Sequence, residues 1–178
     1  MKKSTGRSLK LIVVLSLMSA LSIIFGKYLA FNVGTVLRFS LENLPIVFSG
    51  LAFGPLAGAV VGLVSDLIGC LLVGYEINPL VTLGAAVIGL SAGAVRLLFP
   101  KLTKRLWLTV LLSELIAHLL GSVVIKTVGL AVYYSMPFII LMLWRLLNYL
   151  IIGIIEGALI YVLMKNPAIG KEITSIKK

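Results

Sequence analysis

Six long apolar blocks, separated by short polar breaks, run along this chain of 178 residues. A bilayer core roughly 30 Å thick needs about 20 apolar residues per helix, so six crossings would use most of the chain. The blocks lie at roughly 9–26, 43–54, 57–73, 79–98, 106–127 and 137–164. The sequence therefore predicts an all-α integral membrane protein, in which residues 1–178 form a single membrane domain built as a bundle of six transmembrane helices.

Two details of these blocks refine the prediction. The second block is short, and Gly54-Pro55 joins it to the third, which predicts a helix hairpin with almost no loop. The first block follows a basic tail and has no clear cleavage pattern. We therefore expect it to be retained as the first helix and not removed as a signal peptide.

The positive charge of the chain, formally +10, gathers at the ends of the apolar blocks. This placement is typical of membrane topology signals, so we expect a lipid bilayer and no nucleic acid as partner. Four basic residues lie in the N-terminal tail, four in the connection at 96–105 and four in the C-terminal tail. The connections on the other side hold only Lys27, Arg38 and Lys126. This asymmetry predicts that both termini are cytoplasmic.

Polar side chains inside the blocks are candidates for function, because burying them in a bilayer is unfavourable. They are Asp66, Glu114, His118, Arg145, Asn148 and Glu156. Arg145 and Asn148 are spaced i, i+3, so they share one face of the last helix, in its outer half. With Lys27, Arg38 and Lys126 at the outer helix ends, they would form a cationic pocket that suits a carboxylate ligand.

Other roles for these residues remain open. Arg145 would pair with Asp66 or Glu114 if its role were only to hold helices together. A stand-alone ion-coupled carrier would use Asp66, Glu114 and His118 as a relay. Glu114-x-x-x-His118 lacks the H-E-x-x-H order, Cys70 is the single cysteine, and no Walker A loop is present. We therefore expect no enzymatic activity, no metal and no cofactor.

The connection between the first two blocks is too long for a tight turn and too apolar for a solvated loop. Its apolar residues are Phe31, Val33, Val36, Leu37 and Phe39. Such a segment is expected to fold over a cavity as a lid and to pack on a flat ligand. The alternative is a re-entrant stretch without ligand contact. Tyr75 and Asn78, in the second outer connection, are placed to line the same mouth.

Small residues recur at four-residue spacing in several blocks. Most of these, such as Gly58 and Gly62, are expected to let helices pack closely within the bundle. Ser16 and Ala20 lie on the first helix, at the edge of the bundle. That stripe is a candidate docking site for a helix of a partner protein.

Three runs in the first half of the chain carry a family resemblance. They cover 43–58 (NLPIVFSGLAFGPLAG), 62–69 (GLVSDLIG) and 74–79 (GYEINP). Together they resemble the substrate-binding S components of energy-coupling factor (ECF) vitamin transporters, most closely the folate branch. The resemblance implies a bacterial cell-membrane protein whose six helices hold one vitamin near the outer face. It also implies docking on a transmembrane coupling subunit driven by two cytoplasmic ATPases.

The resemblance implies folate as the favoured ligand. The flat pterin of folate suits Phe39, Tyr75 and asparagine amides, and its carboxylates suit Lys27, Arg38, Lys126 or Arg145. Many folate members carry an arginine near the point where this chain has Ala85-Ala86-Val87. Thiamine, pantothenate or a queuosine precursor are therefore alternative ligands, and a purely structural membrane subunit is an alternative function.

Overall fold

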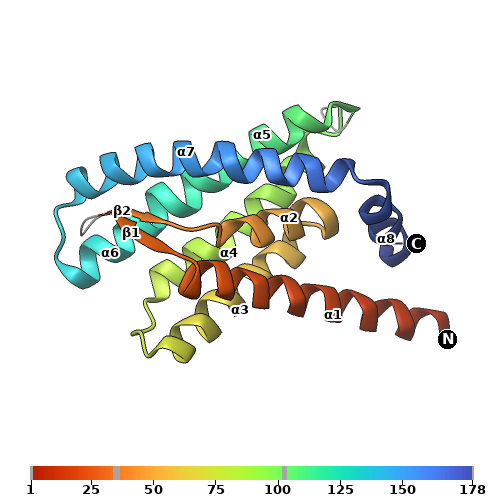
Figure 1. Cartoon of the computed structure of the whole chain (residues 1–178), viewed down its shortest axis with the longest axis horizontal. Coiled ribbons are helices and arrows are strands. Elements are labelled where there is room, and N and C mark those ends of the chain that lie inside the picture. The colour runs from red at the N-terminus through yellow and green to blue at the C-terminus, as the bar shows by residue number, and fades with distance from the viewer. Residues whose placement is uncertain (1, 34–36, 102–103, 178) are drawn as a thin grey trace.

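A computed structural model of the chain describes residues 2–33, 37–101 and 104–177. Nearly all of them are helical, as the apolar blocks predict (Figure 1). The helices run back and forth along the long axis of the molecule. Both termini lie at one end, and a small hairpin, α6 and the start of α7 lie at the other (Figure 1).

The first helix, α1 (Lys2–Ile23), continues into a π-helical turn, η1 (Ile24–Tyr28). The chain then forms two short antiparallel strands, β1 (Phe31–Val33) and β2 (Leu37–Phe39), with Phe31 opposite Phe39. Apolar periodicity does not predict this hairpin, because three residues are too few for a strand pattern to emerge.

The next two helices form the tight hairpin that Gly54-Pro55 predicts. Here α2 (Asn43–Phe53) ends at Gly54, whose φ of 108° favours glycine, and Pro55 begins α3 (Pro55–Val73). At 1.5 Å per residue the 11 residues of α2 span roughly 16 Å, about half of a bilayer core. The chain that connects β2 with α2 runs into the bundle and brings α2 to its centre (Figure 1).

The chain after α3 forms the remaining helical segments. They are α4 (Pro79–Leu98), α5 (Leu106–Ala117), η3 (His118–Ile125), α6 (Lys126–Tyr134), α7 (Phe138–Lys165) and α8 (Pro167–Lys177). The fifth apolar block becomes one continuous segment, α5–η3–α6, which runs past the predicted end at 127 because Val128–Tyr134 stay helical. The short helix α8 was not predicted, and it packs on α7, α1 and α2 near the termini.

Five helical segments of the described chain are long and apolar enough to cross a membrane, at 6–28, 55–73, 79–98, 106–134 and 138–165. The second predicted span, at 43–54, corresponds to α2, which is apolar but too short to cross alone. The predicted count of six spanning helices is therefore not confirmed: five helical segments of the described chain are long enough to cross, and α2 is shorter.

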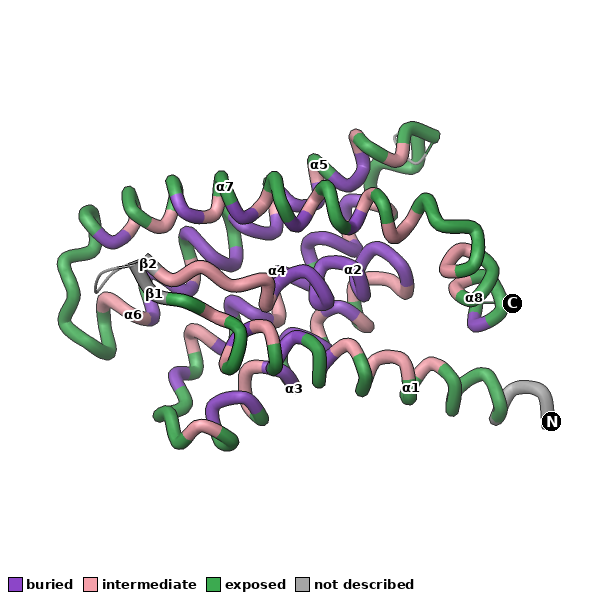
Figure 2. Tube along the Cα trace, in the orientation of Figure 1, coloured by how far each residue is buried: buried purple, intermediate pink, exposed green. Residues whose placement is uncertain are grey.

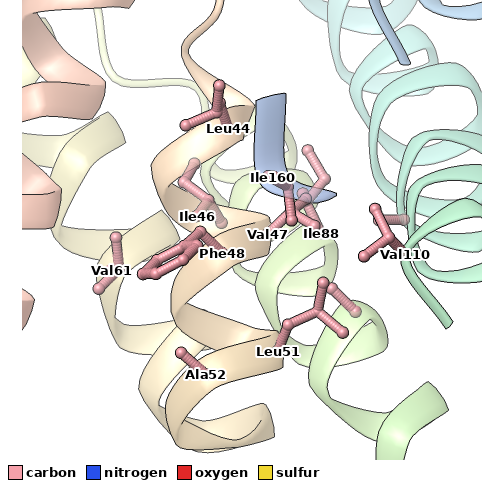
Figure 3. Packing of buried hydrophobic residues seen from close by; sticks show 12 residues of the cluster. Leu44, Ile46, Val47, Phe48, Leu51, Ala52, Val61, Ile88, Val110 and Ile160 are labelled. Atoms are coloured by element: carbon pink, nitrogen blue, oxygen red, sulfur yellow. The ribbon is translucent and has the colours of Figure 1, made fainter. Parts of the chain in front are cut away.

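Buried residues concentrate on α2 and α4, at the centre of the bundle (Figure 2). Leu51, Val47 and Ile46 of α2 pack with Val61 of α3 and Ile88 of α4 (Figure 3). The outer sides of α1 and α7 expose leucine, isoleucine and valine, as expected for helices in contact with lipid.

Glycines let the central helices approach closely. A Cβ atom added to Gly89 of α4 would lie 2.7 Å from the Cα atom of Gly58 of α3, so the two backbones touch there. The predicted role of the small residues in the third and fourth blocks, close packing inside the bundle, is confirmed at this crossing.

Candidate functional site

A cavity of about 650 Å³ lies among η1, β2, α3, α4, α6 and α7. It is therefore near the end of the molecule opposite the termini (Figure 1). Except for Phe39, every residue that the sequence predicts as substrate-binding lines this cavity. These residues are Lys27, Arg38, Asp66, Tyr75, Asn78, Lys126, Arg145 and Asn148.

The four basic residues reach the cavity from four different elements. Lys27 comes from η1, Arg38 from β2, Lys126 from α6 and Arg145 from α7. Folding thus gathers around one cavity charges that lie up to 118 positions apart in the sequence. The sequence prediction of a cationic pocket agrees with this geometry; that it binds a ligand remains to be tested.

Lys126 differs from the other cations because an acid faces it. Its Nζ atom lies 3.2 Å from Oε1 of Glu42, which also lines the cavity. Burial alone would raise the pKa of Glu42, but the cations Lys126, Arg38 and Lys27 outweigh burial and lower it to about 2. Sequence reasoning missed Glu42, although it is the acid immediately before the second apolar block.

Arg145 is held by neutral oxygens. Its Nε and Nη2 atoms donate to the carbonyl of Ser122 at 3.1 and 2.9 Å, and its guanidinium carbon lies 5.2 Å from the ring centroid of Tyr149. The alternative pairing with Asp66 or Glu114 does not occur in the described part of the chain. These contacts position Arg145 while leaving its charge available to an anionic ligand.

Asp66 and Lys27 occupy the α3 side of the cavity. The hydroxyl of Thr82 donates to Oδ2 of Asp66 at 2.6 Å, which fixes the carboxylate. Lys27 donates to Sγ of Cys70 at 3.7 Å and lies 5.5 Å from the ring centroid of Tyr75. Tyr75 is exposed, so it stands at the mouth of the cavity as predicted.

The two asparagines have different roles in the structure. Asn78 caps α4, because its Oδ1 accepts from the amides of Leu80 and Val81 while its Nδ2 donates to the Gly129 carbonyl. Asn148 donates from Nδ2 to the Arg38 carbonyl at 2.9 Å and thereby ties β2 to α7. The buried Oδ1 of Asn148 has no hydrogen-bond partner among the described residues, so it can accept from a ligand.

Phe39 points away from the cavity. Successive residues of a strand face opposite sides, so the cavity receives Arg38 and not its neighbour. Phe39 stacks on Phe31 with ring centroids 5.5 Å apart, in a separate apolar pocket beside Ile152 and Ile155 of α7. The expected packing of these phenylalanines on a flat ligand therefore does not match this arrangement.

Two hydrogen bonds from side chains to backbone carbonyls hold the hairpin in place. Arg38 donates from Nη2 to the Gly26 carbonyl, and Asn148 holds the Arg38 carbonyl. Val36, one of the predicted lid residues, lies outside the described residues, as do the side chains of Val33 and Leu37. The position of the hairpin is compatible with the predicted lid, which remains a prediction.

The predicted docking stripe on α1 faces outward. Ser16 and Ala20 are exposed, whereas Ser19 and Ser22 are buried against the bundle. An outward face is what a docking role requires. Trp144, beside Arg145 in sequence, is 44% exposed and does not line the cavity.

Below the cavity lies a second cluster, formed by Glu114, His118 and Glu156. His118 Nε2 lies 3.0 Å from Oε2 of Glu114 and 3.0 Å from Oε2 of Glu156. The spacing of Glu114 and His118 was visible in the sequence, but the addition of Glu156 required the fold. Asp66 belongs to the cavity, so the three relay residues suggested for an ion-coupled carrier are divided between two sites.

A sequence match to a known family identifies the family of this bundle. The model of a family described as "ECF transporter, substrate-specific component" matches residues 10–164. The chain belongs to this family. Its members are the substrate-binding components of ECF transporters, as the resemblance in the sequence indicates. No curated protein matches the chain in sequence.

Solved ECF components share the fold. The crystal structure of FolT bound with folic acid has a TM-score of 0.68 at 23% identity, over 85% of this chain and 90% of that one. The structure of ThiT from Listeria monocytogenes has a TM-score of 0.66 at 16% identity, over 93% of this chain and 98% of that one. The structure of an S component for biotin has a TM-score of 0.67 at 18% identity, over 94% of this chain and 97% of that one. These neighbours establish the fold of an S component and leave the ligand open.

Proposed function

We propose that this S component captures a vitamin that carries a carboxylate, with folate as the favoured ligand, from the outer face of a bacterial cell membrane. The observation that carries this proposal is the cavity, into which four elements each project a basic residue. A volume of about 650 Å³ lies within the range of about 300–1,000 Å³ that is usual for sites that bind small molecules.

The chemistry of the cavity matches both ends of folate. Carboxylates would meet Arg145 and Lys27, whose contacts are with neutral groups. The amino and ring N–H groups of a pterin would donate to Asp66, which Thr82 holds in place. Tyr75, Tyr134 and Tyr149 offer aromatic faces for a flat ring. Thiamine, pantothenate and a queuosine precursor are the competing ligands.

The orientation in the membrane follows from the same proposal. The chain between β2 and α2 enters the bundle from the hairpin end, and α2 completes this passage, the second along the chain, toward the end with the termini (Figure 1). Six passages place both termini on one side, which the distribution of basic residues assigns to the cytoplasm. The cavity then opens to the outside, and Ser16 and Ala20 dock a transmembrane coupling subunit driven by two cytoplasmic ATPases.

Isothermal titration of the purified chain in lipid nanodiscs tests the proposal. Folate, thiamine, pantothenate and a queuosine precursor are titrated separately, each against the same preparation. A one-to-one complex with folate is the expected result. Tight binding of another vitamin instead would overturn folate but keep substrate capture. Concentrative uptake into vesicles that hold only this chain would favour the stand-alone carrier.

A further inference from the structure

The cluster of Glu114, His118 and Glu156 is buried in the bundle and takes no part in lining the cavity. All three residues are at least 96% buried, and one donor atom from each lies within 4.8 Å of the others. They come from α5, η3 and α7, so the cluster joins two long helical segments. Such a group of ionisable side chains in an apolar bundle requires a compensating partner.

The protein alone does not satisfy this cluster. Nε2 of His118 is 3.0 Å from one carboxylate oxygen of Glu114 and from one of Glu156, but one ring nitrogen can donate a single hydrogen bond. Neither carboxylate oxygen of Glu114 has a hydrogen-bond partner among the described residues. A cation among the three donors would serve both carboxylates, and a divalent one would balance their two charges.

The surroundings hold the donors in the manner of metal ligands. Nδ1 of His118 lies 3.2 Å from Oγ of Ser122, which can accept the Nδ1 proton and leave the Nε2 lone pair free. Oε1 of Glu156 accepts from the backbone amide of Leu44 at 2.9 Å, so only Oε2 turns toward the cluster. In each side chain, one polar atom is held by this contact, so the second polar atom, Nε2 of His118 or Oε2 of Glu156, is oriented toward the cluster.

Two glycines of α7 provide the space in which the donors meet. A Cβ atom at Gly153 would lie 3.3 Å from Cδ2 of His118, and one at Gly157 would lie 3.4 Å from Cγ of Glu114. An apolar pocket of about 260 Å³ borders Glu114 and His118, so free space adjoins the donors on one side.

We propose that Glu114, His118 and Glu156 bind one divalent transition-metal ion of the Zn²⁺ class. One imidazole and two carboxylates suit Zn²⁺ and its neighbours, whereas Mg²⁺ and Ca²⁺ prefer oxygen donors alone. The ion would join α5–η3 to α7 below the cavity. Tyr149, which lines the cavity, stacks on His118 with ring centroids 4.9 Å apart, so the ion would also support the cavity floor.

Metal binding by the untagged full-length chain in nanodiscs tests this site. His118 is the only histidine, so removal of any affinity tag leaves a single imidazole donor. The protein is stripped with a chelator, dialysed and titrated with Zn²⁺, and separately with Co²⁺, whose visible d–d absorption reports the ligands. We expect one ion per chain and a Co²⁺ spectrum that His118→Ala abolishes.

Milder variants test the site even if His118→Ala fails to fold. Ser122→Ala keeps the backbone carbonyl that binds Arg145 but removes the hydroxyl beside Nδ1 of His118. Loss of a hydrogen bond that orients a metal ligand should weaken Zn²⁺ binding about 10–100-fold. Glu172→Gln, which changes an exposed acid on α8, should leave binding unchanged. Absence of a bound ion in the wild-type chain would overturn the proposal and indicate shared protons instead. Equal binding by a folded His118→Ala variant would overturn it as well.

Discussion

Among single residues, Lys126 and Arg145 carry the same charge into the cavity but meet different partners. Glu42 faces Lys126 at 3.2 Å, whereas Arg145 rests on the neutral carbonyl of Ser122. A charge that is already neutralised contributes mainly to stability, and one held by neutral groups can attract an anion. The two residues should therefore respond differently to mutation.

We expect Arg145→Ala to weaken folate binding about 10–100-fold. A hydrogen bond to a charged group contributes about 1.5–3 kcal/mol, and each 1.4 kcal/mol is a tenfold change in Kd. Isothermal titration in nanodiscs measures the change, with Arg105→Ala, an exposed arginine before α5, as the matched control. Unchanged affinity in the Arg145 variant would show that this residue does not contact the ligand.

The ion pair of Glu42 should make thermal stability depend on pH in the acid range. The pKa of Glu42 falls from 4.5 to about 2 in the folded protein, so its stabilising effect is complete above about pH 4.5. As the pH falls from about 4.5 to 2, that contribution of a few kcal/mol is lost. Glu42→Gln should lower Tm at pH 7 and show a flatter acid profile, whereas Glu172→Gln should follow the wild type. Parallel profiles for Glu42→Gln and wild type would contradict this assignment.

Among the helices and strands, sequence predicts the long ones well and the short ones poorly. Apolar blocks of about 20 residues locate α3, α4 and α7 because a bilayer leaves few other structures for them. The strands of the hairpin at 31–39 are too short for such a signal, and α8, which is as long as α2, is too polar. Phe39 is an example. Because the sequence does not predict β2, it does not predict that Phe39 and Arg38 face opposite sides of a strand.

The crossing of α3 and α4 should tolerate no added side chain. Gly89→Ala would bring a methyl group to 2.7 Å from Gly58 Cα, and overpacking of this kind costs about 1–3 kcal/mol. We expect a lower Tm in detergent. Gly6→Ala on α1, where no atom lies within 4 Å of the added Cβ, should leave Tm unchanged or slightly raised. An unaltered Tm for Gly89→Ala would mean that the helices are farther apart.

The exposed stripe of α1 should serve assembly and not ligand binding. Ser16→Trp or Ala20→Trp adds a bulky side chain to an outward face, so we expect loss of co-purification with the coupling subunit and unchanged vitamin affinity. Leu150→Trp, on the exposed side of α7, is the control. Loss of both properties would indicate that the stripe packs inside the bundle.

At the scale of the whole molecule, six passages of the chain should place both ends in the cytoplasm. With Cys70→Ala as a cysteine-free background, Glu76→Cys reports the loop near the cavity mouth and Glu172→Cys reports α8. A membrane-impermeable maleimide should label the first variant in intact cells and the second only after permeabilisation. Labelling of both in intact cells would contradict the orientation.

Contacts between particular residues of the two sites are predictable from sequence only where one helix brings the residues together. Arg145 with Asn148, and Glu114 with His118, are neighbours on one helix and can be recognised by spacing. Glu42 with Lys126, and Glu156 with His118, join residues that are 84 and 38 positions apart. These pairs depend on helix packing, which the sequence pattern alone does not determine.

The two tryptophans stand on the outside of the bundle, at 54% exposure for Trp107 and 44% for Trp144. Trp107 lies in the first turn of α5 and Trp144 in the second turn of α7, and these helix starts lie at opposite ends of the molecule (Figure 1). In the proposed membrane arrangement, one tryptophan therefore lies in each leaflet. Quenching of their fluorescence by brominated lipids would measure the depth of each tryptophan in the bilayer. A change in the difference between the two depths would report tilting of the protein without any added label.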